Sequence, residues 1–343
     1  MEKLGINNII KPKREYEDFP ALVRIIEKLK QSPFTHKDIE AEHQEEAVLG
    51  TAIREISAYE QTLKSYLGRQ GIKTELKKIS ASLFEISLDD NDLIFEDLPK
   101  GYVYHGGAAR AILARKLGIE ENSDSRDIDL AYAGPENARI HDDRLMEKYS
   151  PEDFAHGHGV SSVSDDYFST RDFTINELLV AGNKLVLSKD CLLDTVRGVV
   201  RITDFEKQES VDEEHPYYIK PKLLAKALRL AAVKEMSLAD KEEYACREID
   251  AFHIALHLNR AIEQGREVVE EYVKLLKENK QIPEDLNSLK QIIDYLHQNT
   301  DFVFRIDQKK RLAAESEIIE NILGENPDKF DILPYRQSMS RRS

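Results

Sequence analysis

The sequence predicts an α+β fold, with a small mixed head near the middle of the chain and a helical body after it. Residues 102–105 have the β-branched and aromatic content of a strand, and a Gly-Gly pair and a run of strong helix formers follow. Residues 127–133 alternate polar and apolar side chains up to a Gly-Pro turn, as a half-buried strand does. From residue 220 to about residue 324 the apolar spacing is helical.

The other elements follow from local patterns. Residues 21–31 are amphipathic, as a helix that covers a core would be, and residues 82–88 alternate like a strand. Two apolar runs, 177–180 and 184–187, flank a Gly-Asn turn and predict a β-hairpin. The C-terminal helices are predicted at 220–236, 241–256, 258–278, 286–298 and 308–323.

Changes in composition divide the chain into four parts. Residues 1–98 are predicted to form a mostly helical N-terminal extension, with an accessory or oligomerisation role as the simplest interpretation. Residues 99–205 form the head, and 206–330 form the helical neck and body, which begins with an acidic linker at 206–218. The arginine-bearing tail, 331–343, is expected to be disordered.

The overall composition excludes several classes of protein. The chain has 343 residues, of which 41% are hydrophobic and 33% charged, enough for two or three domains with a sizeable core. Its net charge of −15 argues against generic, charge-driven nucleic-acid binding, although it allows a local basic stripe.

The sequence also indicates the compartment. No apolar run approaches the roughly 20 residues of a membrane helix, so no membrane partner is expected. The N-terminus lacks the apolar stretch of a signal peptide. The two cysteines, Cys191 and Cys246, lie far apart and form no metal-type spacing or disulfide framework. We therefore expect a cytoplasmic protein with two buried, inert thiols.

Two carboxylates in the predicted strand 127–133 are candidate metal ligands. Asp127 and Asp129 are two residues apart, so on a strand they face the same side. Adjacent carboxylates repel each other unless a cation lies between them. Mg²⁺ is commonly held by one or two carboxylates together with substrate phosphates, and a two-metal site can activate one oxygen and stabilise a leaving one. The pair therefore predicts a catalytic magnesium site.

A candidate phosphate site precedes these carboxylates. Gly106 and Gly107 lie between the predicted strand and a helix at 108–117. Glycines let the backbone approach a phosphate closely, and a helix N-terminus supplies free N–H groups. Taken alone, a Gly-Gly pair is more often a turn and Asp-x-Asp is common on surfaces. Their order, with a helix between them, favours a nucleotide site.

A third segment indicates a family. Residues 171–179 (RDFTINELL) closely resemble the Arg-Arg-Asp-Phe-Thr-Ile-Asn-Ala-Leu motif of the class II tRNA nucleotidyltransferase and bacterial poly(A) polymerase family. Residues 106–111 resemble that family's Gly-Gly-x-Val-Arg-Asp motif, and residues 127–129 resemble its catalytic Asp-x-Asp. Residues 226–232 resemble its Arg-Ala-Ile-Arg-Phe-Ala-Ala helix, so the resemblance covers roughly residues 100 to 235.

The resemblance implies a DNA polymerase β-type head, a magnesium cofactor, and transfer of a nucleoside monophosphate from ATP or CTP to an RNA 3′ end, in a tRNA or poly(A)-type addition with tRNA as the expected acceptor. Guanidinium forks suit phosphates, and Asn or Asp side chains can hydrogen-bond sugar hydroxyls. The alternative is that the 171–176 segment is structural. The residues that the resemblance assigns to triphosphate and ribose are Arg110, Arg171, Asp172 and Asn176.

The chain departs from the family pattern at several points. The Gly-Gly to Asp-x-Asp spacing is longer, Ala111 stands where the family has an Asp, and Thr170 replaces the first Arg of the third motif. The family's base-reading Glu-Asp-x-x-Arg motif should fall near residues 219–223, which read IKPKL. Base selection by the family's device is therefore not expected.

One basic stripe remains open to two interpretations. Lys222, Lys226 and Arg229 share a face of the predicted helix 220–236. The stripe is either a solvated face or a contact for phosphate or RNA.

Two other functions remain open because the base-reading motif is missing. The head could modify a protein or a tRNA in a toxin-like system. The chain could instead be a degenerate nucleotide- or RNA-binding protein without turnover.

Overall fold

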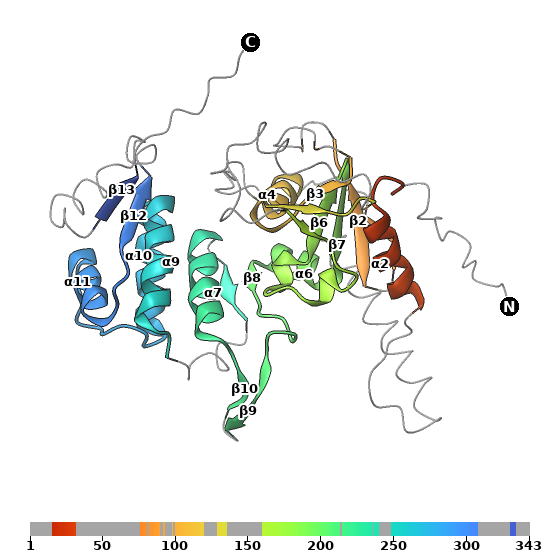
Figure 1. Cartoon of the computed structure of the whole chain (residues 1–343). Helices are drawn as coiled ribbons and strands as arrows, with labels where there is room; N and C mark the ends of the chain where they lie inside the picture. The colour runs from red at the N-terminus through yellow and green to blue at the C-terminus, as the bar shows by residue number, and fades with distance from the viewer. Residues whose placement is uncertain are drawn as a thin grey trace, which may run out of the picture. The chain divides into compact units, whose positions relative to one another are not determined.

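The computed structural model describes residues 16–31, 76–119, 129–135, 160–239, 248–307 and 330–333, with gaps at 81, 90–91, 93–97, 99, 213–214 and 235. The chain forms two compact units, Met1–Val196 and Arg197–Ser343, which are considered separately below (Figure 1). Among the described helices, none combines the length and the apolar character of a membrane span.

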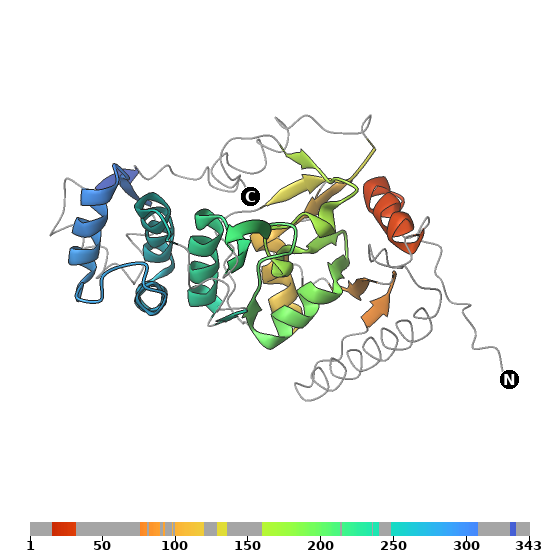
Figure 2. The same ribbon diagram turned by 90° about the horizontal axis from the view of Figure 1, so that it is seen from below.

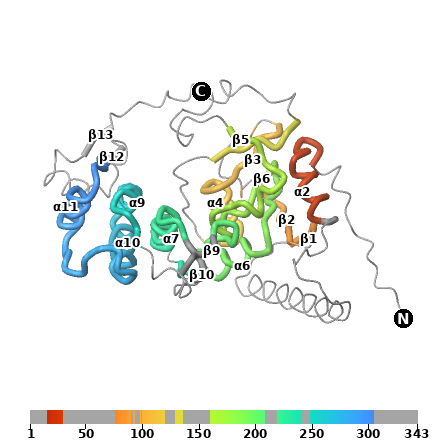
Figure 3. The backbone as a smooth tube through the Cα atoms, turned by 60° about the horizontal axis from the view of Figure 1, so that its bottom comes forward, coloured from red at the N-terminus to blue at the C-terminus, as the bar shows by residue number. Residues whose placement is uncertain are grey.

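The first unit is built on one mixed sheet. All neighbouring strands run antiparallel except the parallel pair β4 and β5. Figure 3 labels β1, β2, β3, β5 and β6 along the backbone of this unit. The order across the sheet is β1 (Leu76–Lys78), β2 (Leu83–Ser87), β7 (Lys184–Ser188), β6 (Leu178–Ala181), β3 (Tyr102–Tyr104), β4 (Leu130–Tyr132) and β5 (Ser161–Ser162).

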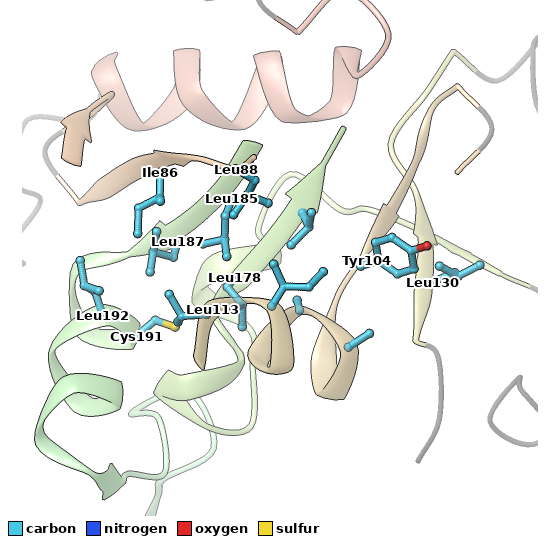
Figure 4. Close-up of a cluster of buried hydrophobic side chains, with 14 of the residues drawn as sticks. Ile86, Leu88, Tyr104, Leu113, Leu130, Leu178, Leu185, Leu187, Cys191 and Leu192 are labelled. Atoms are coloured by element: carbon cyan, nitrogen blue, oxygen red, sulfur yellow. The ribbon is translucent and has the colours of Figure 1, made fainter. Parts of the chain in front are cut away.

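Helices cover both faces of this sheet. The helices α4 (Gly106–Lys116) and α6 (Lys189–Arg197) lie on one face, and α2 (Pro20–Gln31) lies on the other. Strand alternation explains this division, since Leu178 packs towards α4 and α6 while Leu179 packs towards α2. Figure 4 shows the buried side chains between the sheet and the helices α4 and α6. The central strands of the sheet are therefore buried on both sides.

The α+β class and several predicted elements are confirmed. The strands β6 and β7 form the predicted hairpin around Gly182, whose φ is +58°. The strand β3 and the helix α4 follow one another as the sequence predicts. The described part of the predicted strand at 127–133 contains β4, in which Leu130 points into the core.

The N-terminal part of the chain differs from the predicted separate extension, because its described segments are built into the head. The strands β1 and β2 are hydrogen-bonded into the sheet, and α2 packs on its face. The Glu85 carboxylate, 2% exposed, accepts hydrogen bonds from the hydroxyl of Tyr16 and, at 2.7 Å, from the Lys184 Nζ. A central strand needs cover on both faces, and α2 supplies it on one side.

The second unit is mostly helical. The helices α7 (Pro221–Lys234), α9 (Ala251–Gln264) and α10 (Arg266–Glu278) pack on one another, and α11 (Leu289–Asn299) packs on α9. Figure 2 gives a second view of these helices, in green to blue. Three short strand pairs accompany them: β8 (Val199–Val200) with β11 (Ser237–Leu238), β9 (Gln208–Asp212) with β10 (His215–Tyr218), and β12 (Phe304–Asp307) with β13 (Phe330–Leu333).

The helix boundaries in this unit correct the predicted ones. The helix predicted at 258–278 is interrupted by Gly265, whose φ of 113° ends α9 and lets α10 begin. The helix α9 begins at Ala251, where the Asp250 side chain caps it by accepting the His253 N–H at 3.0 Å, and residues 241–247 of the helix predicted at 241–256 lie outside the described residues. The helix predicted at 308–323 lies outside the described residues.

Two segments predicted to lack regular structure contain strands. The acidic segment 206–218, predicted as a linker, contains the β9–β10 hairpin. Residues 331–333 of the predicted tail belong to β13, which pairs with β12. In both segments the backbone N–H and C=O groups pair with a neighbouring strand. Composition alone did not predict this pairing.

Replacing Leu22 of α2 by Ala should destabilise the sheet, because Leu22 is fully buried against it. A buried Leu→Ala change costs about 2–5 kcal/mol. Hydrogen exchange of β6 amides in denaturant should show this loss, whereas the exposed Glu27→Ala change on the same helix should leave exchange within about 0.5 kcal/mol of wild type. Unchanged β6 protection in Leu22→Ala would contradict a shared core.

Candidate functional site

The N-terminus of α4 and the start of β4 form the centre of the candidate site. The helix begins at Gly106, two residues earlier than predicted, so both glycines lie in its first turn. The Gly107 N–H donates a hydrogen bond to the Asp129 Oδ2 at 3.0 Å. His105, the N-cap residue, makes no side-chain capping bond. A carboxylate from the neighbouring strand therefore caps the helix, where the helix dipole favours negative charge.

Gly106 is required at this position by two independent features of the backbone and its surroundings. Its φ is +55°, in the left-handed region that side chains other than glycine rarely adopt. A Cβ atom there would lie 2.2 Å from the Asp129 Oδ2. The glycine therefore makes room for Asp129, which is a different reason from the phosphate approach that the sequence suggested.

His105 joins the same corner and was not predicted as a site residue. Its backbone N–H donates to the Asp129 carbonyl at 3.0 Å, and its Nε2–H donates to the Leu130 carbonyl at 3.2 Å. Burial lowers the pKa of His105, the Asp129 carboxylate opposes that shift, and the Arg171 guanidinium adds to it. The only sequence signal for His105 was its position directly before the Gly-Gly pair.

A polar chain links α4 to the third motif. The Arg110 guanidinium donates to the Asn176 Oδ1, and the Asn176 Nδ2 donates to the Asp172 Oδ1 at 2.6 Å. The same Asp172 oxygen accepts the Phe173 N–H at 3.0 Å. The Arg110 Nε is buried and has no hydrogen-bond partner among the residues that the structure describes. Burial lowers the pKa of Arg110, opposed by the carboxylates of Asp172 and Asp129.

Arg171 lies over an aromatic ring. Its Cζ is 4.2 Å from the ring centroid of Tyr167, which is the distance of a cation–π contact. Tyr167 belongs to the 3₁₀ turn η3 (Tyr167–Ser169) and was not predicted as a site residue, although it lies four residues before Arg171. Burial raises the pKa of Tyr167, and Arg171 opposes the shift.

Buried polar groups fix the segment that carries Asp172 and Asn176. The turn η4 (Thr174–Asn176) is anchored by Thr174, whose Oγ1 donates to the Asp194 Oδ2 of α6 at 2.7 Å. Next to it, the Glu177 carboxylate accepts a hydrogen bond from the Ser188 hydroxyl. Burial raises the pKa of Glu177 to about 8, although the Ser188 hydrogen bond opposes the shift.

The structure brings together most of the predicted site residues in the head. Gly106, Gly107 and Arg110 on α4 meet Asp129 before β4, and the charges of Asp129 and Asp172 both act on Arg110. Arg171, Asp172 and Asn176 join this group through the contacts described above. Asp127 lies outside the described residues, so the predicted convergence of the two carboxylates stays a prediction.

Asp129 fits a magnesium site in its chemistry. Mg²⁺ takes oxygen ligands, and one carboxylate with phosphate oxygens and water is a common set. No group of three or more His, Cys, Asp or Glu side chains in the described part of the chain could hold a metal ion. A metal bound here would therefore use Asp129, with Asp127 as the expected second carboxylate, and oxygens from its substrate.

The predicted basic stripe lies on α7 in the second unit and is only partly exposed. Lys222 is exposed, whereas Lys226 and Arg229 are half-buried. The Arg229 guanidinium donates to the His257 Nδ1 at 3.2 Å and to the Gln264 Oε1 at 3.0 Å. Arg229 therefore has a packing role within the helices, and a phosphate or RNA contact by the stripe stays a prediction.

Comparison with known proteins gives a weak structural likeness. No protein-family model and no curated protein match the chain. The solved structures that resemble it include a tRNA-processing enzyme with CTP, at 18% identity and a TM-score of 0.36, over 58% of this chain and 62% of the other. A CCA-adding enzyme with ATP matches at 14% identity and a TM-score of 0.36, over 65% of this chain and 60% of the other. The match thus spans about 60% of each of these solved structures.

Gly106→Ala should disturb the site more than the same change at Gly182. Both glycines have positive φ, +55° and +58°, so each substitution carries a left-handed penalty of about 1–2 kcal/mol. Only at Gly106 does the new Cβ collide with Asp129, while nothing lies within 4 Å at Gly182. Denaturant unfolding should therefore show a clearly larger loss for Gly106→Ala. Equal losses would contradict the close approach of Asp129.

The stability of the head should fall as the pH rises from about 5 to 8. The pKa of the Glu177 carboxyl is about 8 in the folded chain, against an ordinary value of 4.5, so the folded chain keeps a proton that the unfolded chain releases. Each pH unit in that window then costs up to about 1.4 kcal/mol. Glu177→Gln mimics the protonated side chain, so it should flatten the profile and stabilise the head at pH 8.5. An unchanged slope would show that Glu177 is ionised in the folded chain.

Proposed function

We propose that this chain is a metal-dependent nucleotidyltransferase that moves a nucleoside monophosphate from an NTP to the 3′ end of an RNA. The observation that carries the proposal is the meeting of three sequence segments at the N-terminus of α4. A carboxylate, Asp129, lies against the first helical turn there. The guanidinium of Arg110 is tied to the third motif through Asn176.

The geometry favours a triphosphate as the ligand. The first turn of α4 presents backbone N–H groups, and Arg110 has a buried Nε without an acceptor. A phosphate oxygen would satisfy that donor. Arg171 supplies a second guanidinium, and guanidinium groups bind phosphates with paired N–H donors. Asp172 and Asn176 remain candidates for the ribose hydroxyls, with Asn176 also orienting Arg110.

The proposed reaction follows from these groups. The RNA 3′ oxygen forms a bond to the α-phosphorus while the bond from that phosphorus to the bridging β-oxygen breaks, and pyrophosphate leaves. Bound Mg²⁺ would lower the pKa of the attacking hydroxyl and neutralise phosphate charge. The chain's own contribution is to hold Asp129 at the helix end and to place two guanidinium groups towards developing negative charge.

Nucleotide choice needs residues other than those of segment 219–223. Ile219 is fully buried, the Lys220 Nζ is bound to the Glu206 carboxylate at 2.8 Å, and Pro221 begins α7. Discrimination between bases depends on donors and acceptors that a wrong base leaves unpaired. This segment offers no such pair, which supports either relaxed selectivity or selection elsewhere in the chain.

Asp129→Asn should abolish Mg²⁺-dependent nucleotide incorporation while the protein stays folded. The amide oxygen can still accept the Gly107 N–H, but the metal loses a charged ligand. Asp129→Ala should also be inactive and, in addition, should lose about 0.5–2 kcal/mol because the helix loses its cap. Labelled NTP incorporation and denaturant unfolding measure the two effects.

The acceptor and the base are tested in the same assay. Each of the four labelled NTPs is offered with Mg²⁺ to wild type in the presence of tRNA, other RNA or protein. Label on a tRNA or RNA 3′ end supports the proposal, and label on protein or on an internal RNA position supports the toxin-like alternative. Nucleotide binding without any incorporation would indicate a degenerate binding protein. Turnover retained in Asp129→Asn would contradict the metal assignment.

A further inference from the structure

The contact between Arg171 and Tyr167 joins the third motif to a residue that lies outside every motif that the sequence indicated. The guanidinium Cζ lies 4.2 Å from the ring centroid, so Arg171 rests over the ring of Tyr167. A guanidinium is planar, and its five N–H donors lie in its plane. The ring contact, together with a side-chain hydrogen bond between Tyr167 and Arg171, therefore limits the positions that the guanidinium can adopt.

The Tyr167 ring is itself held rigidly. The side chain is 4% exposed, and its hydroxyl donates to the Leu178 carbonyl of β6 at 3.3 Å. The ring of Phe168 meets it edge-on at 5.3 Å, and the ring of His105 does so at 6.3 Å. These contacts tie the ring to the central strand β6 and to the strand end beside Gly106.

The N-terminal helix holds the segment that carries Tyr167. The Arg24 Nε lies 3.1 Å from the Asp165 carboxylate, and the Lys28 Nζ pairs with Asp166. Tyr167 and Phe168 share a buried cluster with the apolar face of α2. The helix α2 therefore fixes the turn that carries the aromatic ring under Arg171.

We propose that Tyr167 is a positioning residue that holds the Arg171 guanidinium for the triphosphate, with α2 as the support of its turn. This inference rests on the proposed function, since it names how one phosphate-binding group of that site is oriented. It assigns a role to two parts of the chain for which the sequence offered no chemistry, the N-terminal helix and the segment before Arg171.

The test compares substitutions that keep or remove the aromatic face. Tyr167→Leu should raise the KM for NTP at least fivefold with a smaller change in kcat, because Arg171 loses its support. Tyr167→Phe keeps the ring and should stay within twofold of wild type. Phe168→Leu is the comparison variant: it removes a ring that meets the edge of Tyr167 in the same turn and the same cluster but leaves the ring under Arg171 in place, so it should raise KM clearly less than Tyr167→Leu does. An equal rise of KM in Phe168→Leu would show a general packing effect and would overturn the proposal.

A double-substitution cycle with Arg171→Ala tests whether Tyr167 changes KM through Arg171. If Tyr167 acts through Arg171, Tyr167→Leu should change KM less than twofold once Arg171 is Ala. Additive changes would show that the two residues act independently, which would overturn the proposal. If Tyr167→Leu does not fold, Tyr167→Met, which keeps more of the volume but has no aromatic face, takes its place in the same cycle.

A binding measurement separates this proposal from the proposed function. Calorimetry with inorganic tripolyphosphate reports the phosphate site without turnover. If wild type incorporates no nucleotide but binds tripolyphosphate, the proposed reaction fails, and the proposal for Tyr167 stands only if Tyr167→Leu weakens binding at least fivefold and Tyr167→Phe does not. If wild type shows neither incorporation nor tripolyphosphate binding, both proposals are overturned.

Discussion

The hydrogen bond from the Gly107 N–H to the Asp129 carboxylate joins the start of β4 to the first turn of α4, and the candidate site is arranged around it. The bond requires a glycine at position 106, since any Cβ there would overlap the carboxylate. It also places a negative charge at the positive end of α4. A metal-binding carboxylate in this position would thus be held in place before any ligand binds. The Gly-Gly pair and the acidic residue form one structural unit.

The polar chain around this contact is fixed by the buried sheet. Arg110 extends from α4 to Asn176, and Asn176 in turn is held by Asp172. The turn that carries them is anchored to α6 through Thr174 and Asp194. Buried polar groups are costly unless they are paired, so a network of this kind favours a single arrangement of its side chains. Pre-organised donors of that kind are what a reaction that develops phosphate charge requires.

The structure gives the N-terminal segment a different place in the fold from the one that the sequence predicted. Its sequence showed no candidate catalytic or binding residues, and it was predicted to form a separate extension that precedes the head. In the structure, β2 pairs with β7 inside the sheet and α2 covers the face opposite α4. Its exposed cations pair with Asp165 and Asp166, next to the aromatic turn under Arg171. Tertiary packing therefore connects this segment to the site, over a distance in sequence that local patterns do not span.

The sequence by itself determined those helices, strands and turns that depend on residues close together in the chain. Residue type and spacing were sufficient for β3 and α4 and for the β6–β7 hairpin around Gly182, whereas the third motif was selected by its resemblance to a family. Their physical causes, glycine conformational freedom, helix propensity and strand alternation, act over a few residues.

Only the tertiary structure decided features that depend on distant partners. The break at Gly265 and the pairing of β9 with β10 depend on backbone geometry, and composition alone did not indicate them. Arg229 belongs to a predicted basic stripe, yet its guanidinium bonds His257 and Gln264 on another helix. Tyr167 and His105 join the site because the sheet brings their rings together although they lie far apart in the sequence. Such contacts follow from how the elements pack, which no local pattern records.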